Sequence, residues 1–112
     1  MTAKVVIANA FSLNMLTLEV GITNIQACPT SPDVIRMEIE EAGGFTSIVG
    51  HADTAAVFSS LLGLDVPTNR ATFQLEEDHI LFVGQYKGPR LPEGATTMPE
   101  GAKVEWAMVT IA

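Results

Sequence analysis

A histidine stands directly before the clearest helix signal in this sequence of 112 residues. Gly50 and His51 precede residues 53–62, whose apolar side chains share one helical face and which end at Gly63. Backbone N–H groups at the start of a helix attract phosphate, and a histidine can donate a proton to a leaving oxygen near neutral pH. The pair predicts a phosphate site with a general acid. In the alternative interpretation, His51 only caps the helix or pairs with Asp53.

A second polar pair, Arg90 and Glu93, lies in a segment that Pro89 and Pro92 stiffen. A guanidinium binds two phosphate oxygens in a fork, and a nearby carboxylate can orient it or hold a ribose hydroxyl. The spacing therefore predicts a phosphate-binding loop. The alternative is an exposed ion pair, worth about 0 to 1 kcal/mol.

Two more polar residues stand at the ends of predicted elements. Arg70 follows a proline-containing turn, where it either contacts a phosphate or keeps the turn soluble. Asn9 ends the first apolar run and either contacts a ligand or caps the next turn. The sequence contains no paired cysteines, no histidine pair at metal spacing, no phosphate loop and no nucleophile elbow, so local motifs do not favour metal or nucleoside triphosphate chemistry.

Composition limits the class of protein. Six Lys and Arg against thirteen Asp and Glu give a net charge of −7, which disfavours binding to long nucleic acid or to an anionic membrane. With 47% hydrophobic residues, we expect one folded domain over residues 1–112. The single cysteine, Cys28, fits a reducing compartment, and no targeting or membrane segment is evident, so we expect a cytoplasmic protein.

The elements that must position these residues alternate between strands and helices. Residues 4–10 form a β-branched run with almost no polar interruption, which is typical of a buried strand, and residues 11–16 predict one helical turn capped by Ser12. We further expect strands at residues 20–25, a loop at 28–33, hairpins pairing 35–40 with 45–49 and 71–75 with 79–85, and a buried strand at 104–111. This order predicts an α/β fold: a single compact domain with a mixed β-sheet and helices mainly on one face.

Four motifs, in this order and spacing, resemble those of the viral type III anti-CRISPR ring nucleases, a family with cellular relatives that accompany CRISPR systems in bacteria. The resemblance covers nearly the whole chain. It rests on Asn9-Ala10-Phe11-Ser12-Leu13-Asn14-Met15-Leu16, Gly50-His51 with Thr54, Asn69-Arg70, and Arg90-Leu91-x-Glu93-Gly94.

The resemblance implies a homodimeric enzyme that needs neither metal nor cofactor. Its substrate would be cyclic tetra-adenylate, the messenger that activates type III CRISPR nucleases, cut into linear di-adenylates with 2′,3′-cyclic phosphate ends. The ring would lie across the two-fold interface, in the cytoplasm of a prokaryote or of a virus-infected host. By position, the resemblance assigns catalytic roles to His51, Arg90 and Glu93, and ligand contacts to Asn9, Ser12, Gly50, Arg70 and Gln85.

Two other functions use the same motifs. One is a sponge that binds the cyclic nucleotide without cutting it, and the other is a protein that uses this fold only for protein contacts. Retention of His51 with Arg90 and Glu93 favours catalysis over the sponge, because binding alone needs no proton donor beside the scissile bond.

Overall fold

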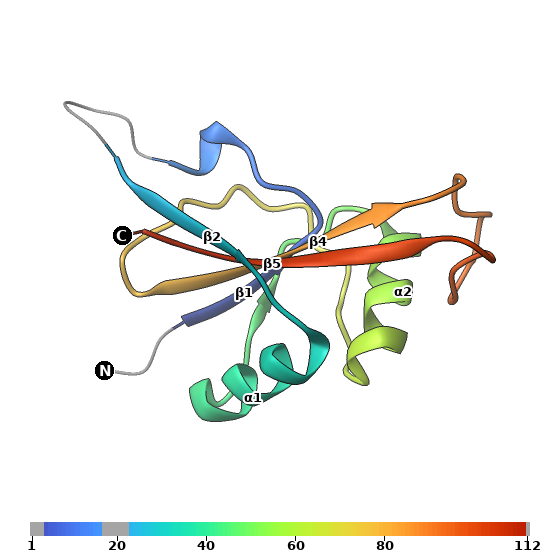
Figure 1. The fold of residues 1–112 in the computed structure, drawn as a ribbon, viewed down its shortest axis with the longest axis horizontal. Coiled ribbons are helices and arrows are strands. Elements are labelled where there is room, and N and C mark those ends of the chain that lie inside the picture. Colours follow the sequence, from blue (N-terminus) through green and yellow to red (C-terminus); the bar gives the residue numbers. More distant parts are fainter. Residues whose placement is uncertain (1–3, 17–22, 112) are drawn as a thin grey trace.

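A five-stranded mixed sheet organises the chain (Figure 1). The computed structural model describes residues 4–16 and 23–111. The sheet has the order β2-β5-β4-β1-β3, in which β1 pairs in parallel with β3 and β4, and β5 pairs antiparallel with β4 and β2. The strands are β1 (Lys4–Ala8), β2 (Ile25–Pro29), β3 (Thr46–Ser47), β4 (His79–Lys87) and β5 (Lys103–Ile111).

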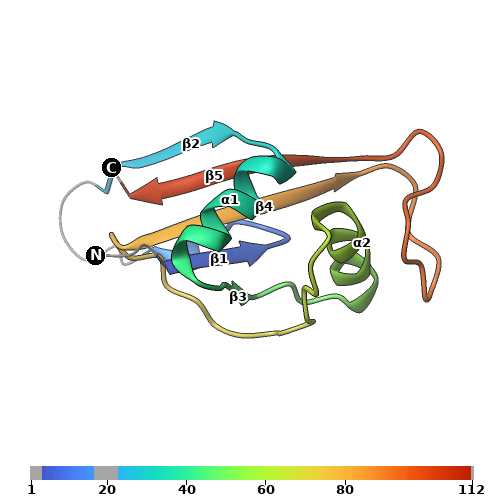
Figure 2. The same cartoon turned by 90° about the horizontal axis from the view of Figure 1, so that it is seen from below.

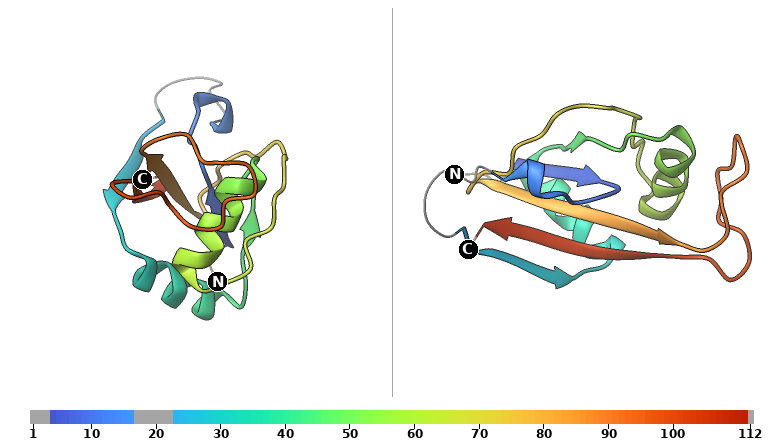
Figure 3. Two further views of the ribbon diagram at one scale, coloured as in Figure 1. Left: turned by 90° about the vertical axis from the view of Figure 1, so that its right-hand side faces the viewer. Right: turned by 90° about the horizontal axis from the view of Figure 1, so that it is seen from above.

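Both α-helices, α1 (Pro32–Ala42) and α2 (Ala52–Leu62), cover the same face of the sheet (Figure 2; Figure 3). Under them lies one apolar cluster, in which Phe58 of α2 and Ile35 of α1 pack with sheet residues such as Phe82. A second cluster lies on the opposite face, covered by the one-turn 3-10 helix η1 (Leu13–Met15) and by irregular chain around Leu75. The predicted fold, a compact α/β domain with helices on one face, is confirmed.

Helix α1 corrects the prediction of a strand at residues 35–40. Its buried residues are Ile35 and Ile39, four positions apart, whereas Met37 between them is 54% exposed. The spacing of Ile35 and Ile39 fits both the period of two of a strand and the period of about 3.6 of a helix. The residues that flank the segment decide between the two. Pro32 begins the helix after Ser31, whose side chain accepts a hydrogen bond from Val34 N, and the helix ends at a left-handed glycine.

The predicted hairpin of residues 35–40 with 45–49 is therefore wrong: β3 pairs in parallel with β1, and Thr46 lies opposite Val6. The hairpin of residues 71–75 with 79–85 is also wrong, because β4 pairs with β5 and residues 71–75 form no strand. Part of the strand expected at 20–25 lies outside the described residues. Cys28 and Pro29, expected in a loop, belong to β2, an edge strand that can accommodate a proline.

Helix α2 and strands β1, β4 and β5 form close to where the sequence places them. Among the described residues, no helix is long and apolar enough to cross a membrane.

Gly84 of β4 lies against two aromatic rings, those of Phe58 and Trp106, whose centroids are 4.7 Å apart. A Cβ at this position would come within 2.5 Å of Phe58 Cζ and 2.7 Å of Trp106 Cζ3. Since the rings are buried, we expect Gly84→Ala to lower the free energy of unfolding by about 1–3 kcal/mol in urea denaturation. The loss should be smaller in a Phe58→Leu background. An unchanged unfolding midpoint for Gly84→Ala would contradict this packing.

Candidate functional site

Candidate residues gather where the parallel strands β1, β3 and β4 end. The carboxyl ends of parallel strands meet at one edge of a sheet, a common place for ligand sites. Asn9 follows β1 directly, Gly50 and His51 connect β3 to α2, and the loop of residues 88–102 follows β4. That loop and α2 lie at the same end of the molecule (Figure 2).

Gly50 is held through both of its backbone polar groups. Its N–H donates to Asn9 Oδ1 at 3.4 Å, and its carbonyl accepts from Arg70 Nε at 2.8 Å. A Cβ on Gly50 would lie 3.4 Å from Arg70 Cγ, so the Arg70 side chain packs directly against this residue. The structure thus brings together three sequence-predicted ligand residues, Asn9, Gly50 and Arg70, which we call the Gly50 clamp. Asn9 therefore does not cap the turn that follows it.

His51 occupies the N-cap position of α2, directly after the Gly50 clamp. Its carbonyl accepts the hydrogen bond from Ala55 N at 2.9 Å, but its side chain makes no capping hydrogen bond and is exposed. Over the described residues, the ion pairs do not include one between Asp53 and His51, and Asp53 Oδ1 accepts a hydrogen bond from Gly94 N at 3.1 Å. The imidazole is therefore free to meet a ligand at a helix start, where backbone N–H groups lack partners within the helix.

The loop of residues 88–102 is attached to α2 by two hydrogen bonds. Besides the contact between Gly94 and Asp53, the hydroxyl of Ser60 donates to Thr96 O at 2.8 Å. Glu93 is thereby held next to a residue that contacts the first turn of α2, the turn that follows His51.

Arg90 and Glu93 are both exposed within that loop. Over the described residues, the ion pairs do not include one between Arg90 and Glu93, so the alternative of a simple surface pair is not realised. Nor does a hydrogen bond join Arg90 to the Gly50 clamp within residues 4–16 and 23–111.

The cations of the chain divide into two groups. All six lie in the described segments, and four of them form ion pairs: Lys4 with Asp78, Arg36 with Asp33, and Lys87 and Lys103 with Glu105. In that part of the chain, Arg70 and Arg90 have no carboxylate partner. The two unneutralised guanidinium groups therefore belong to the clamp and to the loop after β4. Although the net charge of the protein is −7, its two unpaired positive charges lie where the sequence predicts phosphate binding.

Lys87 and Lys103 both hydrogen-bond Glu105, at 3.1 and 3.2 Å, where the β4–β5 hairpin enters the loop. These contacts hold the pKa of Glu105 below its usual range, with Lys87 the larger cause. Glu105 therefore stays charged and neutralises the two lysines.

Ser12 and Gln85 make no hydrogen bond to the Gly50 clamp within the described residues. Ser12 is exposed before η1, and its side chain does not form the predicted cap. Gln85 is exposed on β4 and lines a pocket of about 590 Å³ together with Cys28 and Trp106.

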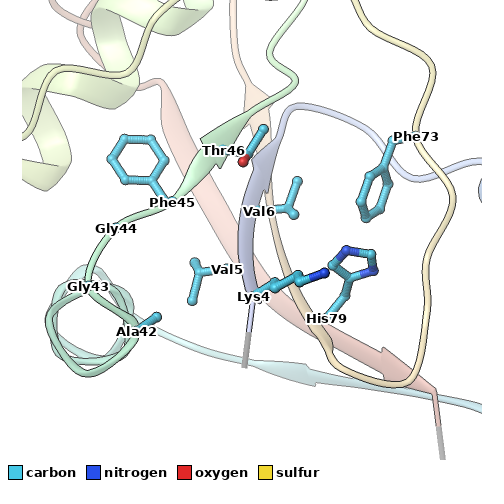
Figure 4. A pocket seen from close by; sticks show the side chains of 10 residues that line it. All are labelled: Lys4, Val5, Val6, Ala42, Gly43, Gly44, Phe45, Thr46, Phe73 and His79. Atoms are coloured by element: carbon cyan, nitrogen blue, oxygen red, sulfur yellow. The ribbon is translucent and has the colours of Figure 1, made fainter. Parts of the chain in front are cut away.

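A separate pocket of about 500 Å³ opens at the amino end of β1 (Figure 4). Its two basic side chains have partners within the protein: Lys4 pairs with Asp78, and His79 Nδ1 accepts from Glu76 N. β1 spans five residues, or roughly 16 Å, so this pocket and the Gly50 clamp lie at opposite ends of the strand. We therefore place the candidate site at the clamp.

Two contributions to the site are not predicted from the sequence: that of Ser47, and that of Asp53 as an anchor for the loop. Asn69 is recognised within the Asn69-Arg70 motif, but its contacts with residues 47 and 49 are not predicted. Ser47 carries no local signal, since its partners lie in a segment about twenty residues further along the chain.

The fold and this cluster define an α/β domain whose candidate anion site is built at the carboxyl edge of its parallel strands. The chain belongs to the STIV B116-like family, whose model matches residues 5–107. Among solved structures, B116 of Sulfolobus turreted icosahedral virus is similar, with 24% identity and a TM-score of 0.75 over 96% of this chain and 98% of that one. That likeness shows a shared fold. None of the curated protein sequences matches the chain.

Proposed function

We propose that this protein is a ring nuclease that cleaves cyclic tetra-adenylate without a metal ion. The supporting observation is the placement of His51: its exposed imidazole stands at the start of α2, beside a glycine whose two backbone groups are held by Asn9 and Arg70. A proton donor, helix N–H groups and an unneutralised guanidinium are thus adjacent. This combination suits a phosphodiester that must be bound and then broken.

The substrate supplies its own nucleophile, so the lack of a serine or cysteine triad is no obstacle. The ribose 2′-oxygen bonds to phosphorus, the bond between phosphorus and the 5′-oxygen breaks, and the 5′-oxygen takes a proton from His51. The proton of the 2′-hydroxyl passes to the Glu93 carboxylate or to water. The product carries a 2′,3′-cyclic phosphate, and two such cuts convert the ring into two di-adenylates.

The two free arginines have different expected tasks. Arg70 uses Nε on the Gly50 carbonyl, which leaves its Nη groups for a phosphate of the ring. Arg90, on the loop after β4, neutralises charge that develops on the phosphoryl oxygens, and Glu93 polarises the 2′-hydroxyl. Other cations are paired, so long nucleic acid finds no extended positive surface, whereas a small ring requires only local contacts.

A symmetric ring with two scissile phosphodiesters suits a pair of sites. We therefore propose that two copies of the chain form a homodimer around one ring, each presenting its own His51 to opposite phosphates.

Wild-type protein is expected to convert radiolabelled cyclic tetra-adenylate to di-adenylate with a cyclic phosphate end, at the same rate with and without EDTA. The reason is that the proposed steps use only side chains and the substrate's own hydroxyl. Chromatography of the products measures the conversion. Loss of activity in EDTA would contradict the metal-free mechanism. An intact ring that co-elutes with the protein would identify a sponge, and no association would leave only protein contacts.

A further inference from the structure

Residues 67–70, which we call the strap, run beside residues 47–50 and are joined to them by hydrogen bonds that do not involve Arg70. Asn69 donates twice: its backbone N–H to Val49 O and its side-chain Nδ2 to Ser47 O, each at 2.8 Å. The Ser47 hydroxyl donates to Pro67 O at 2.6 Å. Three bonds over so few residues fix the strap against the chain that leads to His51.

Ser47 is the buried member of this arrangement, with 4% of its surface exposed. Its hydroxyl also accepts a hydrogen bond from Val49 N at 3.2 Å. One oxygen atom therefore joins the strap to the backbone of residue 49 in its own segment. A buried hydroxyl costs free energy unless it is hydrogen-bonded, and an alanine would fill the core without that requirement. The hydroxyl therefore contributes hydrogen bonds that fix the position of the strap, and not apolar packing.

The strap holds the segment before His51 from the side opposite to β1. Ile48 N donates to Ile7 O of β1, and Gly50 N donates to Asn9, so one side is attached to the sheet. Val49 O and Gly50 O face the strap and accept from Asn69 and Arg70. The peptide before His51 is therefore fixed from both sides, although residues 65–76 contain no regular element.

We propose that the strap is a positioning element of the reaction centre, in which Ser47 and Asn69 hold His51 in line with the leaving oxygen without touching the ring. This inference rests on the proposed ring-nuclease function. Orientation of a catalytic group is worth a large part of a rate enhancement, and a displacement of about 1 Å can cost roughly 100-fold. Loss of a strap bond should accordingly reduce the rate more than the affinity.

The test compares Asn69→Ala and Asn69→Asp with Thr68→Ala. Both Asn69 variants lose the Nδ2 donor to Ser47 while keeping the backbone bond to Val49. Thr68 is an exposed strap residue whose side chain makes no hydrogen bond within the described chain, so it is the matched control. At saturating cyclic tetra-adenylate in EDTA, we expect single-turnover rates about 10- to 100-fold lower for the Asn69 variants, with ring affinity within about threefold. Thr68→Ala should match the wild type.

A rate equal to that of the wild type in Asn69→Ala, or an equal loss of rate and affinity, would overturn the positioning role. Thermal denaturation of each variant identifies a temperature at which all of them are folded, so unfolding does not affect the measured rates. If the wild type cleaves no ring, the proposed function fails instead.

A measurement without substrate tests the strap independently of activity. In ¹⁵N-labelled protein, hydrogen exchange at the amides of Val49 and Gly50, which donate to Ser47 Oγ and Asn9 Oδ1, should be faster in Asn69→Ala than in the wild type and unchanged in Thr68→Ala. Unchanged exchange in Asn69→Ala would overturn the proposal whether or not the wild type is a nuclease.

Discussion

Replacing His51 with alanine is expected to lower the single-turnover rate of ring cleavage by about 100-fold or more, while ring affinity stays within about tenfold. The imidazole is exposed and makes no capping hydrogen bond, so its removal leaves α2 and the Gly50 clamp intact. What is lost is the proton for the leaving 5′-oxygen, a contribution of roughly 10²- to 10⁴-fold in general acid catalysis. Rapid-quench kinetics with labelled cyclic tetra-adenylate give the rate, and filter binding gives the affinity.

The chain contains its own control for this experiment. His79, the other histidine, accepts a hydrogen bond from Glu76 N and lines the pocket at the amino end of β1, away from the clamp. His79→Ala should therefore cleave at the wild-type rate. An undiminished rate in His51→Ala would contradict the general-acid role of His51.

An element of this fold can be predicted from the sequence when neighbouring residues alone determine it. Strand β1 follows from an unbroken β-branched run, and α2 from one apolar face that ends at Gly63, so both are recognised from neighbouring residues. The prediction for residues 35–40 is wrong because Ile35 and Ile39 fit the period of a strand as well as that of a helix. The N-cap at Ser31 is the signal that distinguishes the two. The pairing of β3 with β1 escapes prediction because two residues make that strand.

The candidate site shows the same limit. His51, Asn9 and Arg70 are recognisable by residue type and by their places at element ends, and the structure brings the last two onto Gly50. The strap cannot be recognised from the sequence, because Ser47 and Asn69 are 22 residues apart and come into contact only in the folded chain. Residues that contact a ligand can be recognised by their chemical type, whereas residues that position them can be recognised only from their place in the folded structure.

The pairing of charges would allow an acidic chain to bind the proposed anionic ligand. With a net charge of −7, the long-range field repels nucleic acid. At contact distance, however, an arginine without a carboxylate partner keeps an uncompensated charge, and Arg70 and Arg90 are the cations in this condition within the described residues. Arg70 still has its Nη donors, since only its Nε is used, on the Gly50 carbonyl. We therefore expect selectivity for a compact ligand over a polymer, because only groups at short range contribute attraction.

Arg90→Ala is expected to weaken ring binding by about tenfold and to lower the cleavage rate by about 100-fold, since its fork would contact a phosphate in the ground state and more strongly in the transition state. Arg90→Lys should recover part of the affinity but little of the rate, because an ammonium keeps the charge and loses the bidentate geometry. Single-turnover rates and ring binding across a salt series measure both effects.

Lys4→Ala is the matched control, because it removes the same charge from a cation that Asp78 already neutralises at the far end of β1. If net charge alone governed binding, Lys4→Ala and Arg90→Ala would weaken it equally, and the loop arginine would be an ordinary surface charge. A loss confined to Arg90→Ala instead requires a phosphate held by this side chain. Because that loop is attached to α2 through Gly94 and Asp53, such a loss would also connect the loop after β4 with His51 in one reaction centre.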